Sequence, residues 1–124
     1  MAKWTSLIVG VLSGGLARYV FSGAVYRVLG TGFPYGTLAV NLSGCFLIGV
    51  LDGLAVTKLM LGPNARLMLM TGFCGAYTTL STLVLETDNL FRDGETAKAL
   101  SNVAVSLVAG FILFRIGKVL CELI

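Results

Sequence analysis

The chain alternates between long apolar runs and short connectors that contain glycine, proline or charged residues. A membrane-spanning helix needs about 20 mostly apolar residues, and each long run reaches that length. Glycine and proline in the connectors interrupt helices and favour turns. The pattern predicts an all-α fold of four transmembrane helices, over residues 4–29, 36–56, 65–91 and 97–120.

The composition supports lipid as the solvent of this chain. Of its 124 residues, 56% are hydrophobic and 12% are charged, whereas soluble domains carry about 25% charged residues. A chain with so few charges has too little polar surface to face water. Four spans use nearly the whole length, so we expect residues 1–124 to form a single membrane domain.

The basic residues that flank the spans give little preference for one orientation. Lys and Arg near span ends normally lie on the cytoplasmic side. Here they divide between two sides, with Lys3, Lys58, Arg66, Lys118 and the nearby Arg115 on one and Arg27, Arg92 and Lys98 on the other. Two interpretations remain open: a single topology set by a small bias, or insertion in both orientations, which would allow an antiparallel homodimer.

Residue types that catalysis needs are scarce. The chain has no histidine and no G-x-S-x-G nucleophile motif. The acidic residues within spans are Asp52, Glu86 and Asp88, which lie near span ends and leave no carboxylate pair at the membrane centre. The three cysteines lie in apolar stretches and are interpreted as small packing residues: Cys45, Cys74 and Cys121. The sequence therefore indicates that the protein is not an enzyme.

Two polar residues lie deep within predicted spans. A charge such as that of Arg18 is expensive there and is usually functional or paired, although an arginine can also extend its guanidinium to the interface. Asn41 lies in the middle of the second span. Its NH2 group could donate to an anion, or its side chain could simply hold two helices together.

The centre of the third span contains residues that weaken a helix. Residues 71–83 include two glycines, four threonines and one serine, and both Gly and β-branched Thr are poor helix formers. A break at this depth is tolerated only inside protein or beside a water-filled path. Such a break would offer carbonyls to cations and amides to anions. We expect a broken third helix, with a kinked packing helix as the alternative.

Asn102 and Ser106 are four residues apart on the fourth span and therefore share one face of that helix. Together they would form a short polar track. Ser106 could instead donate its hydroxyl to its own helix.

Three stretches of the sequence resemble motifs of the Fluc/CrcB family of fluoride channels. Residues 14–19 read GGLARY, similar to Gly-Gly-x-x-Arg-Tyr. Residues 36–44 read GTLAVNLSG, similar to G-T-L-x-V-N-x-x-G. Residues 72–82 read GFCGAYTTLST, similar to G-x-x-G-x-x-T-T-F-S-T-F, and Glu86 follows. The length and the four-span layout also agree, so the resemblance covers nearly the whole chain.

The resemblance implies an antiparallel homodimer with two fluoride pores and a structural sodium ion at its centre. By position, the backbone carbonyls of Gly75 and Thr78 would hold the sodium. The positions that match the pore are Asn41, Leu80, Ser81, Thr82, Leu83, Asn102 and Ser106. Arg18 and Glu86 match accessory positions, and Arg18 would attract anions into a vestibule.

Leu80 and Leu83 depart from the family pattern, which has phenylalanine at both positions. The edge of an aromatic ring carries partial positive charge, and in the family these edges are thought to face fluoride. Gly110 and Phe114 also replace polar residues found in some members. The donors that remain are Asn41, Ser81, Thr82 and Ser106. Three interpretations stay open: a channel that works with hydroxyl and amide donors alone, a weakly conducting channel of natural or engineered origin, or one half of a heterodimer whose partner supplies the rings.

These features predict a passive, fluoride-selective channel that exports cytoplasmic fluoride across a prokaryotic plasma or inner membrane. Its partners would be fluoride, lipid and a second subunit, and not nucleic acid. A narrow path lined by donors would give the selectivity. The alternatives are a degenerate or heterodimeric channel subunit and a small dual-topology coupled transporter. The last needs a membrane-embedded carboxylate, which the first span lacks.

Overall fold

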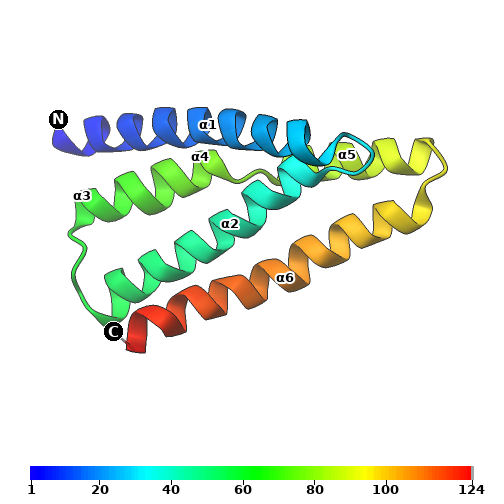
Figure 1. The fold of residues 1–124 in the computed structure, drawn as a ribbon. Helices are drawn as coiled ribbons and strands as arrows, with labels where there is room; N and C mark the ends of the chain where they lie inside the picture. The colour runs from blue at the N-terminus through cyan, green and yellow to red at the C-terminus, as the bar shows by residue number, and fades with distance from the viewer. Residues whose placement is uncertain (124) are drawn as a thin grey trace.

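The computed structural model describes residues 1–123 and is built from helices joined by short connections (Figure 1). Within these residues, four helical segments are long and apolar enough to cross a membrane, which confirms the predicted all-α fold. Three of them are α1 (Ala2–Leu29), α2 (Tyr35–Asp52) with its π-helical extension η1 (Gly53–Thr57), and α6 (Thr96–Leu123). The remaining segment is composite and consists of α3 (Pro63–Arg66), η2 (Leu67–Cys74), α4 (Gly75–Tyr77) and α5 (Leu80–Arg92).

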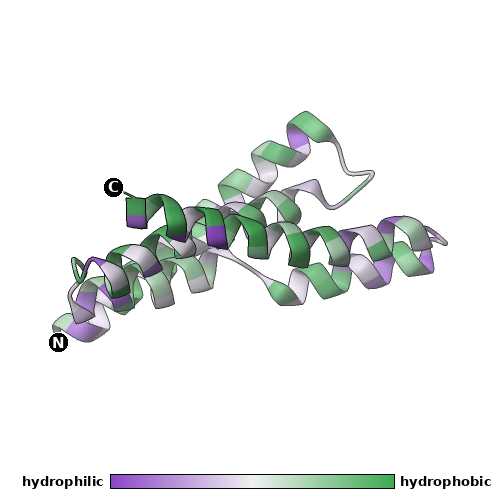
Figure 2. Cartoon of the chain, turned by 90° about the horizontal axis from the view of Figure 1, so that it is seen from below, coloured by the Kyte–Doolittle hydropathy of each residue, from purple (hydrophilic) through white to green (hydrophobic). Residues whose placement is uncertain are grey.

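Successive segments run in opposite directions, so their connections gather at two ends of the bundle (Figure 1). Both termini and the α2-to-α3 connection lie at one end, and the α1-to-α2 and α5-to-α6 connections lie at the other. Figure 2 shows hydrophobic residues along most of the length of the helices. The basic residues that the sequence divides between two sides therefore lie mostly towards opposite ends of the bundle.

Glycines allow neighbouring helices to approach at backbone distance. A Cβ atom at Gly14 of α1 would collide with the carbonyl oxygen of Phe73 in η2. A Cβ atom at Gly49 of α2 would collide in the same way with the carbonyl oxygen of Phe114 in α6. Small residues commonly permit such close packing between helices in lipid. They bring α1 against the third segment and α2 against α6.

Gly14→Ala is expected to lower the unfolding temperature of the detergent-solubilised protein. The added methyl group meets backbone atoms of Phe73, which cannot move aside as a flexible side chain can. Overpacking of this kind costs about 1–3 kcal/mol. Gly23→Ala, on the same helix, is the matched control because its added Cβ would meet no atom within 4 Å. Equal unfolding temperatures for the two variants would contradict the proposed close contact.

Polar side chains hold the end of the bundle where the termini lie. The Lys118 Nζ of α6 is 2.8 Å from Asp52 Oδ2 at the end of α2. The Arg66 guanidinium donates to the carbonyl oxygens of Leu61, at 3.0 Å, and Ala55. Arg66 thereby pairs one carbonyl in the last turn of η1 and one in the connection that follows it.

The third segment is broken near its middle, as the sequence predicted. Thr78 (φ −83°, ψ 159°) and Thr79 (φ −151°, ψ 118°) have extended backbones between α4 and α5. Before the break, η2 is wound as a π-helix over eight residues, and π-helical turns occur frequently at functional sites. The break therefore places non-helical backbone within a segment long enough to span a membrane.

Candidate ion pathway

The threonines at the break both end one helix and begin the next. The Thr78 backbone N–H and hydroxyl donate to the carbonyl oxygen of Cys74, at 3.0 and 2.9 Å, and so close the end of α4. Thr79 is the N-cap of α5, where its Oγ1 accepts a hydrogen bond from the Thr82 backbone N–H at 3.2 Å. The Thr82 hydroxyl lies 3.0 Å from the same oxygen. N-capping by a threonine side chain satisfies one of the unpaired donors at a helix start.

Asn41 of α2 bonds to the backbone of the break through both ends of its carboxamide. Its Oδ1 accepts from the Thr79 N–H at 2.8 Å, and its Nδ2 donates to the Thr79 carbonyl oxygen at 3.0 Å. The extended backbone thus finds the partners that lipid cannot provide. One Nδ2–H of Asn41 remains after these two bonds. The side chain therefore holds two segments together and still has a donor to offer.

An open groove of about 480 Å³ lies between α2, the third segment and α6. It brings together six of the residues singled out in the sequence: Asn41, Gly75, Thr78, Leu80, Leu83 and Ser106. The last carbonyls of a helix have no intrahelical donor, and Gly75 and Thr78 carry backbone carbonyls at such an end. Carbonyl oxygens suit a hard cation such as sodium, so this donor set fits the cation that the resemblance implies.

The two leucines at the start of α5 have different surroundings. Leu80 is 71% exposed and Leu83 is 6% exposed, and both line the groove. Leucine gives an anion no donor and no ring edge. The Ser81 side chain is exposed and its Oγ lies 3.3 Å from Thr79 Oγ1. The polar groups near the leucines therefore come from the break itself and from Ser106.

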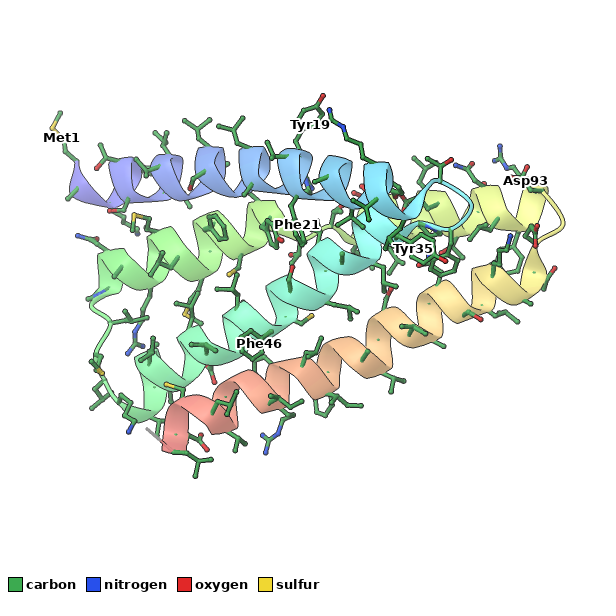
Figure 3. The ribbon with its side chains drawn as sticks, viewed as in Figure 1. Met1, Tyr19, Phe21, Tyr35, Phe46 and Asp93 are labelled. Carbon is green, nitrogen blue, oxygen red and sulfur yellow. The ribbon has the colours of Figure 1, made fainter. Side chains whose placement is uncertain are left out.

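A second pocket, of about 280 Å³, shares Thr79 with the groove. It is lined by Arg18 with hydroxyl-bearing residues that include Ser22, Thr37, Thr79 and Thr82. Arg18 is partly buried, and within residues 1–123 no carboxylate forms a salt bridge with it. Tyr19, its neighbour in the same motif, is 80% exposed and points away from the bundle (Figure 3). The structure therefore distributes most of the predicted site residues between two pockets that share Thr79, while Ser81, Asn102 and Glu86 line neither of them.

Glu86 of α5 accepts hydrogen bonds from two hydroxyl groups of other segments. Its Oε1 lies 2.8 Å from Tyr26 Oη of α1 and 2.8 Å from Thr37 Oγ1 of α2. Its Oε2 is buried and has no hydrogen-bond partner in the described part of the chain. Glu86 and Tyr26 also line a pocket of about 360 Å³ near the α1-to-α2 connection. The sequence interpretation did not identify Tyr26 or Thr37 as partners of this carboxylate.

Asn102 and Ser106, which share one face of α6, are both buried. Asn102 is completely buried, and its Nδ2 donates to Thr87 Oγ1 of α5 at 3.1 Å. Thr87 Oγ1 in turn donates to the Leu83 carbonyl oxygen at 2.7 Å. Ser106 Oγ has no partner among residues 1–123, so it does not bond to its own helix. Thr87 is a residue that the sequence interpretation missed, although it lies one helical turn after Leu83.

Comparison with known proteins gives these residues a family context. Residues 5–118 match the sequence profile of the family described as "CrcB-like protein, Camphor Resistance (CrcB)". A fluoride-specific ion channel FluC from Chlorobaculum tepidum is 48% identical over 119 residues, which is 94% of this chain and 94% of the relative. The protein of the same name from Maridesulfovibrio salexigens is 39% identical over 124 residues, covering 100% of this chain and 98% of the relative. Another, from Citrifermentans bemidjiense, is 49% identical over 102 residues, or 82% of each chain.

The match extends through all four membrane-length segments and includes every residue of the two pockets and of the Asn102 contact. Its extent and the level of identity exclude a chance similarity of apolar composition alone. This protein belongs to the CrcB family.

Proposed function

We propose that this protein is a fluoride-selective channel of a prokaryotic plasma membrane that lets fluoride leave the cytoplasm passively. Its relatives are named fluoride-specific ion channels. The observation that carries the proposal is the broken third segment, where Asn41 holds Thr79 and hydroxyl groups surround non-helical backbone. Such a break is tolerated only inside protein or beside a water-filled path, and a path lined by hydrogen-bond donors is what a selective anion channel needs.

Fluoride is strongly hydrated, so a path through lipid must replace its water with hydrogen-bond donors. The donors available are the hydroxyls of Ser81, Thr82 and Ser106 and the remaining Nδ2–H of Asn41. Arg18, without a salt-bridge partner in residues 1–123, would draw anions towards Thr82 in the same pocket. The path needs no carboxylate that gains and loses a proton, which favours passive flow over coupled transport.

We further propose that two copies assemble antiparallel, with the groove of one facing the groove of the other and two pores per dimer. Lipid-exposed irregular backbone does not occur within the hydrocarbon region. Gly75 and Thr78 nevertheless line an open groove at the break, so another protein surface should cover them. The weak asymmetry of basic residues is compatible with insertion in both orientations. In such a dimer the Gly75 and Thr78 carbonyls of both copies would hold a sodium ion, whose positive charge would offset the cost of an anion nearby.

Fluoride efflux from liposomes that contain only this purified protein is the decisive experiment. A fluoride electrode would follow the efflux, chloride efflux would be the control, and light scattering would establish the number of copies beforehand. We expect fast fluoride efflux without chloride efflux from a two-copy assembly. This result would mean that Leu80 and Leu83 are compatible with conduction. A folded dimer that passes no fluoride would overturn the proposal, and recovery on reconstitution with a phenylalanine-bearing relative would then identify a heterodimer subunit.

A further inference from the structure

Asn102 is wholly buried, yet one of its polar atoms is left without a partner. The Nδ2 donates to Thr87 Oγ1 at 3.1 Å, while the Oδ1 has no hydrogen-bond partner among residues 1–123. A buried acceptor in this condition is destabilising. Such an atom in a native structure calls for an explanation, and a functional role is one of the recognised explanations.

The contacts of Thr87 allow a second arrangement in the same space. The two ends of a carboxamide have similar size, so a half-turn of the Asn102 amide would bring Oδ1 to Thr87 and turn the NH2 group away. The Thr87 hydroxyl, which now donates to the Leu83 carbonyl at 2.7 Å, would then donate to Oδ1 instead. The Leu83 carbonyl would keep the backbone N–H of Thr87, because residues four apart in an α-helix share that bond.

The two arrangements present opposite groups to the interior. In the present arrangement the Asn102 Oδ1, a hydrogen-bond acceptor, points away from Thr87. Its partial negative charge would repel an anion. The rotated arrangement would place the two N–H donors of Asn102 where Oδ1 now lies. Ser106 is on the same face of the helix, and its buried Oγ has no partner in the described chain. Without an anion the rotated form leaves two buried donors unsatisfied. The present form leaves Oδ1 and one N–H of Asn102 unsatisfied, but it makes two hydrogen bonds, from Asn102 to Thr87 and from Thr87 to Leu83. The rotated form would make only the bond from Thr87 to Asn102, so the present form is the better arrangement for the empty protein.

We propose that Thr87 is a positioning residue that lets Asn102 change from an acceptor to a donor when fluoride arrives. The single hydroxyl proton of Thr87 goes either to Leu83 or to Asn102, and its position decides which end of the amide faces the ion. Fluoride favours the arrangement with two donors and shifts the population towards it. This inference rests on the proposed function, because it assigns a role to Thr87 within the same ion path.

Thr87→Val tests the inference because valine keeps the shape of threonine and removes the hydroxyl. We expect the initial rate of fluoride efflux to fall by about fivefold, the factor that corresponds to one ordinary hydrogen bond. Thr87→Ser, which retains a hydroxyl, should stay within about twofold of the unchanged protein. Size-exclusion profiles and unfolding temperatures establish that the variants are folded. Thr87→Ala takes the place of the valine variant, with the same expectation, if the latter does not fold.

A double-variant cycle separates positioning from packing. Asn102→Ala should lower the efflux rate, and the addition of Thr87→Val to that variant should change it no further, because Thr87 acts only through Asn102. A Thr87→Val protein as fast as the unchanged one would overturn the inference. The inference would also be overturned if the efflux rate fell equally in Thr87→Val and Thr87→Ser. It would be overturned as well if Thr87→Val lowered the rate further in a protein that already carries Asn102→Ala. An unchanged protein that passes no fluoride would refute the proposed function, and this inference with it.

Discussion

Asn41→Asp is expected to abolish fluoride efflux from liposomes. The aspartate would still accept from the Thr79 N–H, but it would lose the donor that now bonds to the Thr79 carbonyl at 3.0 Å. It would also place a negative charge beside the path of an anion. Two unit charges 4 Å apart repel each other by about 4 kcal/mol at an effective dielectric constant of about 20, which corresponds to a reduction in rate of roughly a thousandfold.

The matched control for this variant is Asn64→Asp, which makes the same chemical change on an exposed residue of α3. It should leave the efflux rate unchanged. Asn41→Leu separates the two causes, because it removes the contact with Thr79 without adding charge. If Asn41→Asp conducts as well as the control, Asn41 does not line the ion path. If Asn41→Leu and Asn41→Asp lower the fluoride efflux rate by the same factor, the cause is the lost contact with Thr79 at the break and not the added charge.

The break in the third segment was predictable because its cause is local. Glycine and threonine weaken a helix wherever they occur, and Thr78 and Thr79 follow one another where the backbone becomes extended. The four spans were predictable for the same reason, since each depends on about 20 consecutive apolar residues. The N-cap of α5 is also local, because it is a hydrogen bond between residues three apart, from the Thr82 N–H to Thr79 Oγ1.

Contacts between distant parts of the chain were not predictable in this way. Glu86 bonds to Tyr26 and Thr37, which are 60 and 49 residues away, and no periodicity in the sequence pairs them. The Asn41 contact with Thr79 spans 38 residues. A mid-span asparagine signals that a partner is needed, but the identity of that partner follows only from the packing of α2 against the third segment.

The sequence interpretation did not predict that the pore residues would line two different pockets. It assigned Asn41 and Thr82 together to the pore and Arg18 to a vestibule, whereas the fold places Asn41 in the groove and Thr82 with Arg18 in the smaller pocket. Thr79, whose backbone bonds to the Asn41 amide, lines both pockets. Because Thr79 lines both pockets, we expect substitutions at its contact with Asn41 to have the largest effects.

Arg18→Glu is expected to reduce fluoride efflux by more than tenfold. The guanidinium lines a pocket with Ser22, Thr79 and Thr82 and forms no salt bridge within residues 1–123, so its charge is available to an anion. At a distance of about 10 Å from an anion and an effective dielectric constant of about 20, each unit of charge on residue 18 changes the interaction energy with the anion by about 1.7 kcal/mol. Loss of one unit therefore corresponds to roughly a tenfold change in rate.

A graded series distinguishes this electrostatic role from a structural one. Arg18→Gln removes one unit of charge and should give a rate between those of the unchanged protein and Arg18→Glu. The control is Arg115→Glu, the same reversal at an exposed position of α6 that lines neither of the two pockets. Higher salt should narrow the differences among the three proteins, because mobile ions screen partly exposed charges. Rates that fall equally in the Gln and Glu variants, or that fall equally in Arg18→Glu and Arg115→Glu, would show that Arg18 does not act on the anion through its charge.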